Sequence, residues 1–176
     1  VVNTQVGSVI SNDRFKNLSR IGNKVLNQAK DFNTKYIFWQ ESDLIIDENT
    51  ISHLIELSHN TSWEKTLAIA PVAMFNWQGQ DLFYDTWAFE GSKGEKWTNQ
   101  DLNKLMCYQD ELRPMKSIGS CALLNAELLR KYNIDFGEGC FPELCRQGKS
   151  FGLNIYCDVG SMIKHPSDAY ISGRMV

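Results

Sequence analysis

The chain has 176 residues, of which 43% are hydrophobic and 22% are charged, and its formal net charge is -3. This length and composition predict one globular domain over residues 1–176 and argue against disorder. A weakly acidic chain without a cluster of lysine and arginine has no electrostatic footprint for nucleic acid, so we expect no nucleic-acid partner.

The cysteines lack the paired spacing of a metal site. They lie in apolar surroundings, so we expect reduced core thiols rather than a disulfide framework. The five are Cys107, Cys121, Cys140, Cys145 and Cys157. No apolar run reaches membrane-spanning length and no signal peptide is visible, which predicts a cytoplasmic chain without a membrane span.

The first predicted elements alternate between helix and strand. Apolar residues recur at helical spacing over residues 14–31, and residues 36–40 follow as a strand. Apolar residues between Ile51 and Leu57 mark a second helix. The continuous apolar run at residues 67–75 suits a strand that is covered on both faces.

The second half continues the alternation after a polar and aromatic stretch that ends near Thr98. A short helix comes next, then a strand at residues 117–125 and another helix. Residues 142–151 read as a helix and residues 154–159 as a strand. This order predicts an α/β layered fold with a mostly parallel sheet.

Two acids follow the strand at residues 36–40. In a mostly parallel sheet, ligands gather outside the carboxyl ends of the strands, and Glu41 and Asp43 occupy that place. Acids on alternate residues leaving a strand point to the same side, so both could approach one divalent cation. The alternative is that Glu41, Ser42 and Asp43 only form a turn, and the spacing alone favours that simpler interpretation.

Three segments together resemble a known family. They are "NKVLNQAKDFNTKYIFWQESDLIID", "DLFYDTWAFEGSKGEKW" and "IGSCALLNAELLRKYNIDFGEGCFPELCRQGKSFGLNIYCDVGSMIKHP". They resemble, in this order, the D-x-D strand, an acceptor-side segment and the closing block of nucleotide-sugar-dependent glycosyltransferases of the GT-A fold. The second segment is similar to that of capsule-type mannosyltransferases. The resemblance implies a single-domain three-layer sandwich with a mostly parallel central sheet.

The resemblance implies transfer of a sugar from a nucleoside-diphosphate sugar to a glycan hydroxyl. Asp43 matches the metal-binding acid of D-x-D, Glu41 stands where the family usually has Asp, and His165 matches a histidine that completes the metal site. The implied cofactor is Mn²⁺ or Mg²⁺, which neutralises charge on the leaving nucleotide. Without the family, His165 reads as a turn residue before Pro166.

The same resemblance places three residues at the nucleotide or its phosphates: Arg20, Asn23 and Ser42. For Arg20 and Asn23, a solvated helix face is the competing interpretation. A base is needed if the sugar configuration inverts, and Glu138 and Glu143 are the candidates. Glu143 also reads as a first-turn helix residue favoured by the helix dipole.

Aromatic residues crowd the stretch between Asn76 and Thr98, together with acids. Aromatic faces stack on sugar rings while carboxylates accept hydroxyl protons, so this composition suits a carbohydrate acceptor. The alternative is that most of these rings belong to the core. The residues that we predict at the acceptor are Trp77, Tyr84, Asp85 and Trp87.

Two features depart from the family. Its domains begin with a strand and helix that hold the nucleotide base, and residues 1–10 supply at best a second strand. Either the first strand and helix are missing from this sequence, or the chain is a trimmed core whose donor binding would be compromised. Glu41 replaces the usual Asp. Both departures leave open a second function, that of a catalytically silent carbohydrate-binding module on the same fold.

Overall fold

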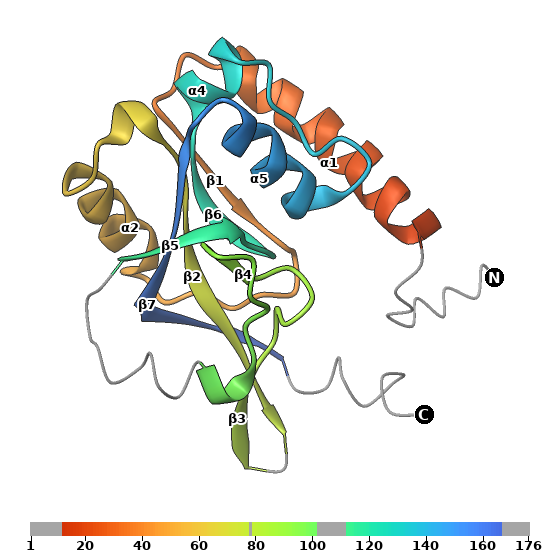
Figure 1. Ribbon diagram of the computed structural model, residues 1–176, viewed down its shortest axis with the longest axis vertical. Helices are drawn as coiled ribbons and strands as arrows, with labels where there is room; N and C mark the ends of the chain where they lie inside the picture. Colours follow the sequence, from red (N-terminus) through yellow and green to blue (C-terminus); the bar gives the residue numbers. More distant parts are fainter. Residues whose placement is uncertain (1–11, 78, 102–111, 167–176) are drawn as a thin grey trace.

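In the computed structural model, which describes residues 12–77, 79–101 and 112–166, seven strands form one sheet. Helices lie against both faces of this sheet (Figure 1). Two long helices and one short helix cover one face, and a third long helix covers the other. The α/β class predicted from the sequence is therefore confirmed.

The elements are numbered in chain order. The helices are α1 (Asn12–Asp31), α2 (Thr50–His59), the 3₁₀ turn η1 (Trp63–Lys65), α4 (Ala126–Lys131) and α5 (Cys140–Ser150). The strands are β1 (Tyr36–Gln40), β2 (Thr66–Trp77), β3 (Gln80–Phe83), β4 (Glu90–Gly91), β5 (Leu112–Ser117), β6 (Cys121–Asn125) and β7 (Asn154–His165). Within the described ranges no helix has the length and apolar character needed to span a membrane.

The prediction of a mostly parallel sheet is wrong. The strand order is β1-β6-β2-β7-β5-β4, with β3 paired to β2, and among the described strands only β2 and β7 pair in parallel. β6 is antiparallel to both of its neighbours, β1 and β2. The three strands β1, β2 and β7 still run in one direction. Helix–strand alternation predicted this shared direction, but it could not reveal that β6 inserts between β1 and β2.

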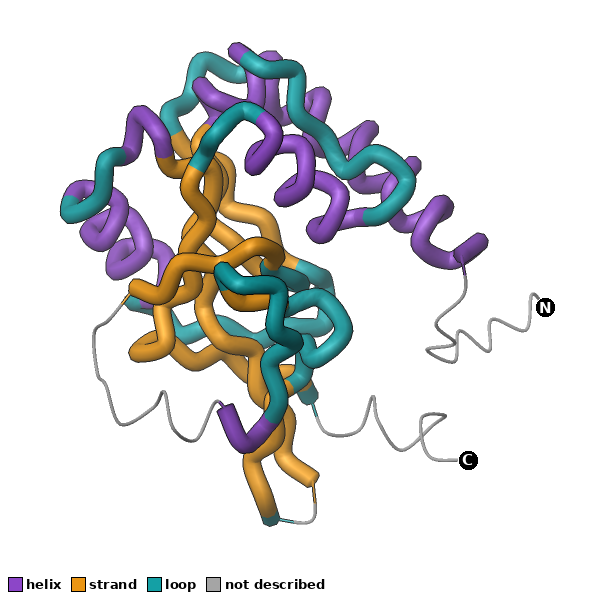
Figure 2. The backbone as a smooth tube through the Cα atoms, viewed as in Figure 1, coloured by secondary structure: helices purple, strands orange, loops and turns teal. Residues whose placement is uncertain are grey.

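The core is divided by the sheet because side chains alternate between its two faces. Along β2, Ala68 and Ala70 pack with α1 and α5, whereas Ile69 packs with Leu54 and Leu57 of α2. The apolar run of β2 is therefore buried on both faces, as the sequence predicted. Figure 2 shows the result as orange strands with purple helices on either side.

The predicted strand at residues 117–125 is interrupted. β5 ends at Ser117 and β6 begins at Cys121, with a turn between them. A Cβ at Gly119 would lie 2.8 Å from the Cβ of Ala88 and 2.9 Å from Oδ1 of Asp85. Because Asp85 and its neighbours press on this turn, it needs a residue without a side chain.

β7 is longer than the predicted strand at residues 154–159. Pro71 of β2 pairs with Asp158, and the next residue, Val72, pairs with Met162, so residues 159–161 bulge out. The buried Asp158 carboxylate accepts the N–H of Gly160 at 3.0 Å inside this bulge. After the bulge the strand continues to His165, which the sequence pattern placed in a turn.

Four of the cysteines form no disulfide bond within the described residues, and Cys107 lies outside them. Cys121, Cys145 and Cys157 are buried. Burial raises the pKa of Cys145 to about 12, so this thiol is protonated at neutral pH. The prediction of core thiols is confirmed for these three buried positions.

Asn125 joins β6 to α4 and is 1% exposed. Its Oδ1 accepts the N–H groups of Glu127 and Leu128, each at 3.1 Å, and its Nδ2 donates to the carbonyl of Trp63 at 2.7 Å. The side chain therefore caps α4 and satisfies a buried carbonyl at once.

We expect Asn125→Ala to lower the free energy of unfolding by about 2–3 kcal/mol, because the cap and a buried hydrogen bond are both lost. Asn49→Ala is the control, since Asn49 stands at the N-cap of α2 without a side-chain cap hydrogen bond. It should cost less than about 0.5 kcal/mol. Urea unfolding measures both, and equal losses would contradict the assignment of Asn125.

Candidate functional site

Asp43 and His165 meet at one edge of the sheet. Oδ2 of Asp43 lies 3.1 Å from Nε2 of His165, and the side chains are 49% and 2% exposed, respectively. Asp43 follows β1 and His165 ends β7, so both lie at the carboxyl ends of strands that run in the same direction. The structure therefore brings together two of the three residues predicted to bind a metal.

The two ring nitrogens of His165 both face oxygen acceptors. Nδ1 lies 3.0 Å from the carbonyl of Pro166, and Nε2 faces Asp43. A neutral imidazole has one N–H, so it can donate to only one of these oxygens. Several arrangements satisfy both oxygens, and a cation between Nε2 and the carboxylate is one of them.

A tight turn positions Asp43. The Gln40 side chain donates to the carbonyl of Leu44 at 2.7 Å, and the N–H of Leu44 donates to the carbonyl of Glu41 at 3.2 Å. Beyond the turn, Ile45 and Lys164 exchange two backbone hydrogen bonds of 2.7 and 2.9 Å. The acid is thus held beside the end of β7 by backbone pairing on one side and by β1 on the other.

Tyr84 fixes the plane of the His165 ring. The two rings stack with centroids 4.0 Å apart and an interplanar angle of 21°. Tyr84 is held in turn by its N–H, which donates to Ala73 of β2 at 2.9 Å, and by an edge contact with Phe75. Tyr84 is 7% exposed, so its place is beneath the site. Its predicted contact with an acceptor stays a prediction.

Asp85 and Glu41 lie on the two sides of Ser120. The hydroxyl of Ser120 donates to Oδ1 of Asp85 at 2.5 Å, and the carbonyl of Ser120 accepts the N–H of Glu41 at 3.0 Å. Asp85 is 1% exposed. Burial raises the pKa of the neighbouring Cys121 thiol, and the carboxylates of Asp85 and Glu41 raise it further. Asp85 therefore has a structural role, and acceptor binding by this residue is untested.

The donor set at this edge fits a divalent cation in part. A carboxylate and an imidazole are common metal ligands. The second nitrogen of this imidazole faces a backbone carbonyl, as the non-coordinating nitrogen of a metal-bound histidine usually does. Among the described side chains, however, no group of three His, Cys, Asp or Glu is close enough to hold a metal. That Glu41 is a third ligand stays a prediction. The prediction assumed that side chains keep alternating after β1, and the turn at residues 41–44 ends this alternation.

The two predicted bases have different surroundings. Glu138 is exposed and lies 3.5 Å from Nζ of Lys16 on α1. Glu143 accepts two hydrogen bonds from Arg146, at 2.7 and 2.6 Å, and a third from Gln147. The hydrogen bond from Arg146 holds the pKa of Glu143 below its ordinary value. This supports the interpretation of Glu143 as a helix residue and leaves Glu138 as the candidate base.

The three residues predicted at the nucleotide are not gathered by the contacts of the described chain. Arg20 and Ser42 are exposed. The side-chain amide of Asn23 makes two hydrogen bonds within the protein. Its Nδ2 donates to the carbonyl of Gly137 at 3.2 Å, and its Oδ1 accepts the N–H of Phe136 at 2.8 Å. Asn23 therefore joins α1 to the loop before α5, and its contact with a nucleotide stays a prediction.

Of the two predicted acceptor tryptophans, Trp87 is half-buried. Its ring contacts Phe15 of α1, with centroids 5.1 Å apart. The Trp77 side chain lies outside the described part of the structure. Trp87 thus connects the loop after β3 to α1, and its role as a sugar platform is untested.

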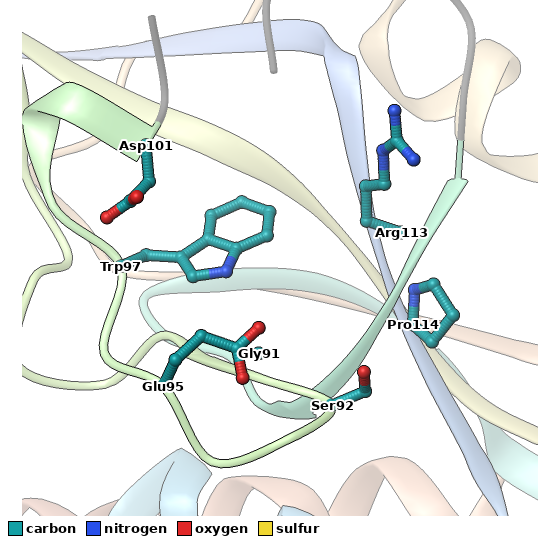
Figure 3. A pocket seen from close by; sticks show the side chains of 7 residues that line it. All are labelled: Gly91, Ser92, Glu95, Trp97, Asp101, Arg113 and Pro114. Atoms are coloured by element: carbon teal, nitrogen blue, oxygen red, sulfur yellow. The ribbon is translucent and has the colours of Figure 1, made fainter. Parts of the chain in front are cut away.

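The sequence analysis did not single out a pocket of about 350 Å³ beside β4 and β5 (Figure 3). Its lining contains two carboxylates, a guanidinium and an indole, from Glu95, Asp101, Arg113 and Trp97. Trp97 and Glu95 stand in the aromatic and acidic stretch that suggested a carbohydrate site. Arg113 comes from β5, which was not predicted. Only the sheet topology reveals that Arg113 lies beside Trp97.

Comparisons of this chain with models of protein families and with curated protein sequences find no match.

We expect Arg146→Ala to raise the pKa of Glu143 towards its ordinary value, because the chief hydrogen bonds to the carboxylate are lost. Gln147→Ala should raise it less. The lowered pKa stabilises the fold above the pKa of the unfolded carboxyl, and this contribution disappears as the pH falls through the folded pKa. Carbon NMR titration of the carboxyl measures the shift, and an unchanged pKa in Arg146→Ala would refute the pairing.

Proposed function

We propose that this chain is a glycosyltransferase that moves a sugar from a nucleoside-diphosphate sugar to a glycan hydroxyl, with a divalent cation held by Asp43 and His165. The observation that carries the proposal is the contact between the half-exposed Asp43 carboxylate and the buried His165 imidazole. The resemblance of three segments to GT-A glycosyltransferases agrees with it.

The chemistry of His165 supports the cation. With Nδ1–H donated to the Pro166 carbonyl, the Nε2 lone pair is directed at Asp43, where it would serve as a ligand for the cation. When bound, Mn²⁺ or Mg²⁺ supplies positive charge for the diphosphate of the leaving nucleotide. Oxygens of that diphosphate and water would complete the coordination.

The protein's own residues set up this geometry in advance. Stacking on Tyr84 holds the imidazole plane, and the Ile45–Lys164 pairing holds the turn that carries Asp43. A preorganised pair loses little side-chain freedom when the donor binds, and preorganisation is the main electrostatic contribution that a rigid site makes. Asp43 keeps half of its side chain open, which leaves room for the donor.

Convergence of the predicted segments also supports the assignment. The acid turn after β1, the Tyr84–Asp85 pair and the His165 terminus are far apart in the sequence, yet they meet through direct contacts. The resemblance to glycosyltransferases singled out residues of all three segments. A structural turn alone gives no reason for these segments to share one edge of the sheet.

We expect Asp43→Asn and His165→Gln each to weaken binding of a nucleoside-diphosphate sugar in Mn²⁺ by at least about tenfold to a hundredfold. The control is Glu48→Gln, which neutralises another exposed carboxylate five residues from Asp43. Calorimetric titration with a panel of donors, with and without chelator, measures the effect. Equal donor affinity in Mn²⁺ and in chelator for the unmutated protein would refute the proposal of a metal-dependent transferase.

Glu138 is proposed as the base if the sugar configuration inverts. We expect Glu138→Gln to lower the transfer rate by about two to four powers of ten, because the amide cannot take the acceptor proton. Glu143→Gln is the matched control, since this carboxylate is committed to Arg146. Rates and product configuration are read by proton NMR. A small effect of Glu138→Gln, with configuration retained, would exclude this carboxylate as base.

A further inference from the structure

We propose that the pocket beside β4 and β5 binds a neutral sugar ring of the glycan acceptor. This inference rests on the proposed transferase function. The pocket is lined by Gly91, Ser92, Glu95, Trp97, Asp101, Arg113 and Pro114, and its volume of about 350 Å³ lies in the range of small-molecule sites.

The lining offers hydrogen-bonding groups of both kinds. The Glu95 and Asp101 carboxylates accept hydrogen bonds, the Arg113 guanidinium donates them, and the Ser92 hydroxyl does both. Figure 3 shows the Trp97 indole between the two carboxylate side chains, with Arg113 and Pro114 on the opposite side. A ligand with several hydroxyls around an apolar ring matches such a set, since each hydroxyl is both a donor and an acceptor.

The charges of the lining select against the donor nucleotide. Among the described residues of the lining, two carboxylates lie beside one guanidinium, so a phosphate group entering the pocket meets more negative than positive charge from these side chains. A neutral sugar carries no such penalty. The acceptor, rather than the diphosphate, is therefore the substrate that this pocket suits.

The two carboxylates that accept hydrogen bonds in the pocket are held in place before a ligand arrives. A turn closes on Gly91, whose N–H donates to the Glu95 carbonyl at 2.8 Å, and the Glu95 carboxylate accepts the N–H of Lys93 at 3.0 Å. The Asp101 carboxylate accepts the N–H and the hydroxyl of Thr98 at 3.1 and 2.7 Å. Such preorganisation lowers the entropic cost of binding.

One segment of the chain, residues 84–97, contacts the Asp43–His165 pair at its start and lines the pocket at its end. Tyr84, which stacks on His165, begins the segment that continues through Glu90 to Trp97. The Trp97 ring packs on Phe89 with centroids 5.9 Å apart, and Glu90 pairs with Lys116 of β5 at 3.3 Å. One ordered segment therefore supports both the cation ligand and the sugar pocket.

The test uses the full chain, labelled with ¹⁵N at tryptophan, without nucleotide or metal. The probes are glucose, mannose, galactose and xylose, with glucose 6-phosphate as the anionic comparison. We expect at least one neutral sugar to shift the Trp97 indole N–H signal saturably, and glucose 6-phosphate to bind at least about tenfold more weakly than glucose. No saturable shift with any neutral sugar up to tens of millimolar would overturn the proposal.

Glu95→Gln removes one charged acceptor at an exposed position, so the fold should survive it. We expect about a tenfold loss of sugar affinity, and no loss in the control Glu56→Gln, an exposed carboxylate on α2. Unchanged affinity in Glu95→Gln would place the sugar elsewhere and overturn the proposal.

The two proposals fail separately in these measurements. Metal-dependent donor binding with no sugar at Trp97 would overturn the pocket and leave the transferase standing. Sugar binding at Trp97 without any donor binding would overturn the transferase and the acceptor role, and would leave a carbohydrate-binding protein.

Discussion

Two backbone hydrogen bonds between Ile45 and Lys164 hold the acid turn after β1 against the last residues of β7. They bring the Asp43 carboxylate to the buried imidazole of His165 across a sheet in which β1 and β7 are not neighbours. Without this pairing, the turn would depend on the short contacts within residues 40–44 and on the hydrogen bond from the Glu41 N–H to the Ser120 carbonyl. The contact between Asp43 and His165, and with it the proposed cation site, depends on this pairing.

Buried polar groups around Asp85 connect this site to the rest of the fold. Ser120 binds Asp85 through its hydroxyl and Glu41 through its carbonyl, so the break between β5 and β6 supports the acid turn. The space beside Gly119 is occupied by Asp85 and Ala88. A buried carboxylate is costly unless it is hydrogen-bonded, so this small network specifies one arrangement of the loop.

The periodic elements could be predicted from the sequence because each depends on local spacing. α1 and α2 appear where apolar residues recur at helical spacing, and β2 appears where the apolar run is continuous. The direction of β6 and the bulge of β7 could not be predicted, since both depend on which strands become neighbours. Asp43 and His165 were named through a resemblance, and the structure shows that their side chains are in contact. The role of Asn23 and the place of Arg113 beside Trp97 follow from tertiary packing, which leaves no local signal.

The central claim is that Asp43 and His165 hold one divalent cation for a nucleoside diphosphate. A crystal grown with Mn²⁺ and a nucleoside diphosphate, measured near the manganese absorption edge, tests it most directly. The account predicts an anomalous peak within coordinating distance of Oδ2 of Asp43 and Nε2 of His165, with Nδ1 still on the Pro166 carbonyl. A bound diphosphate with manganese elsewhere, and Nε2 of His165 still in direct contact with Oδ2 of Asp43 with no cation between them, would contradict it.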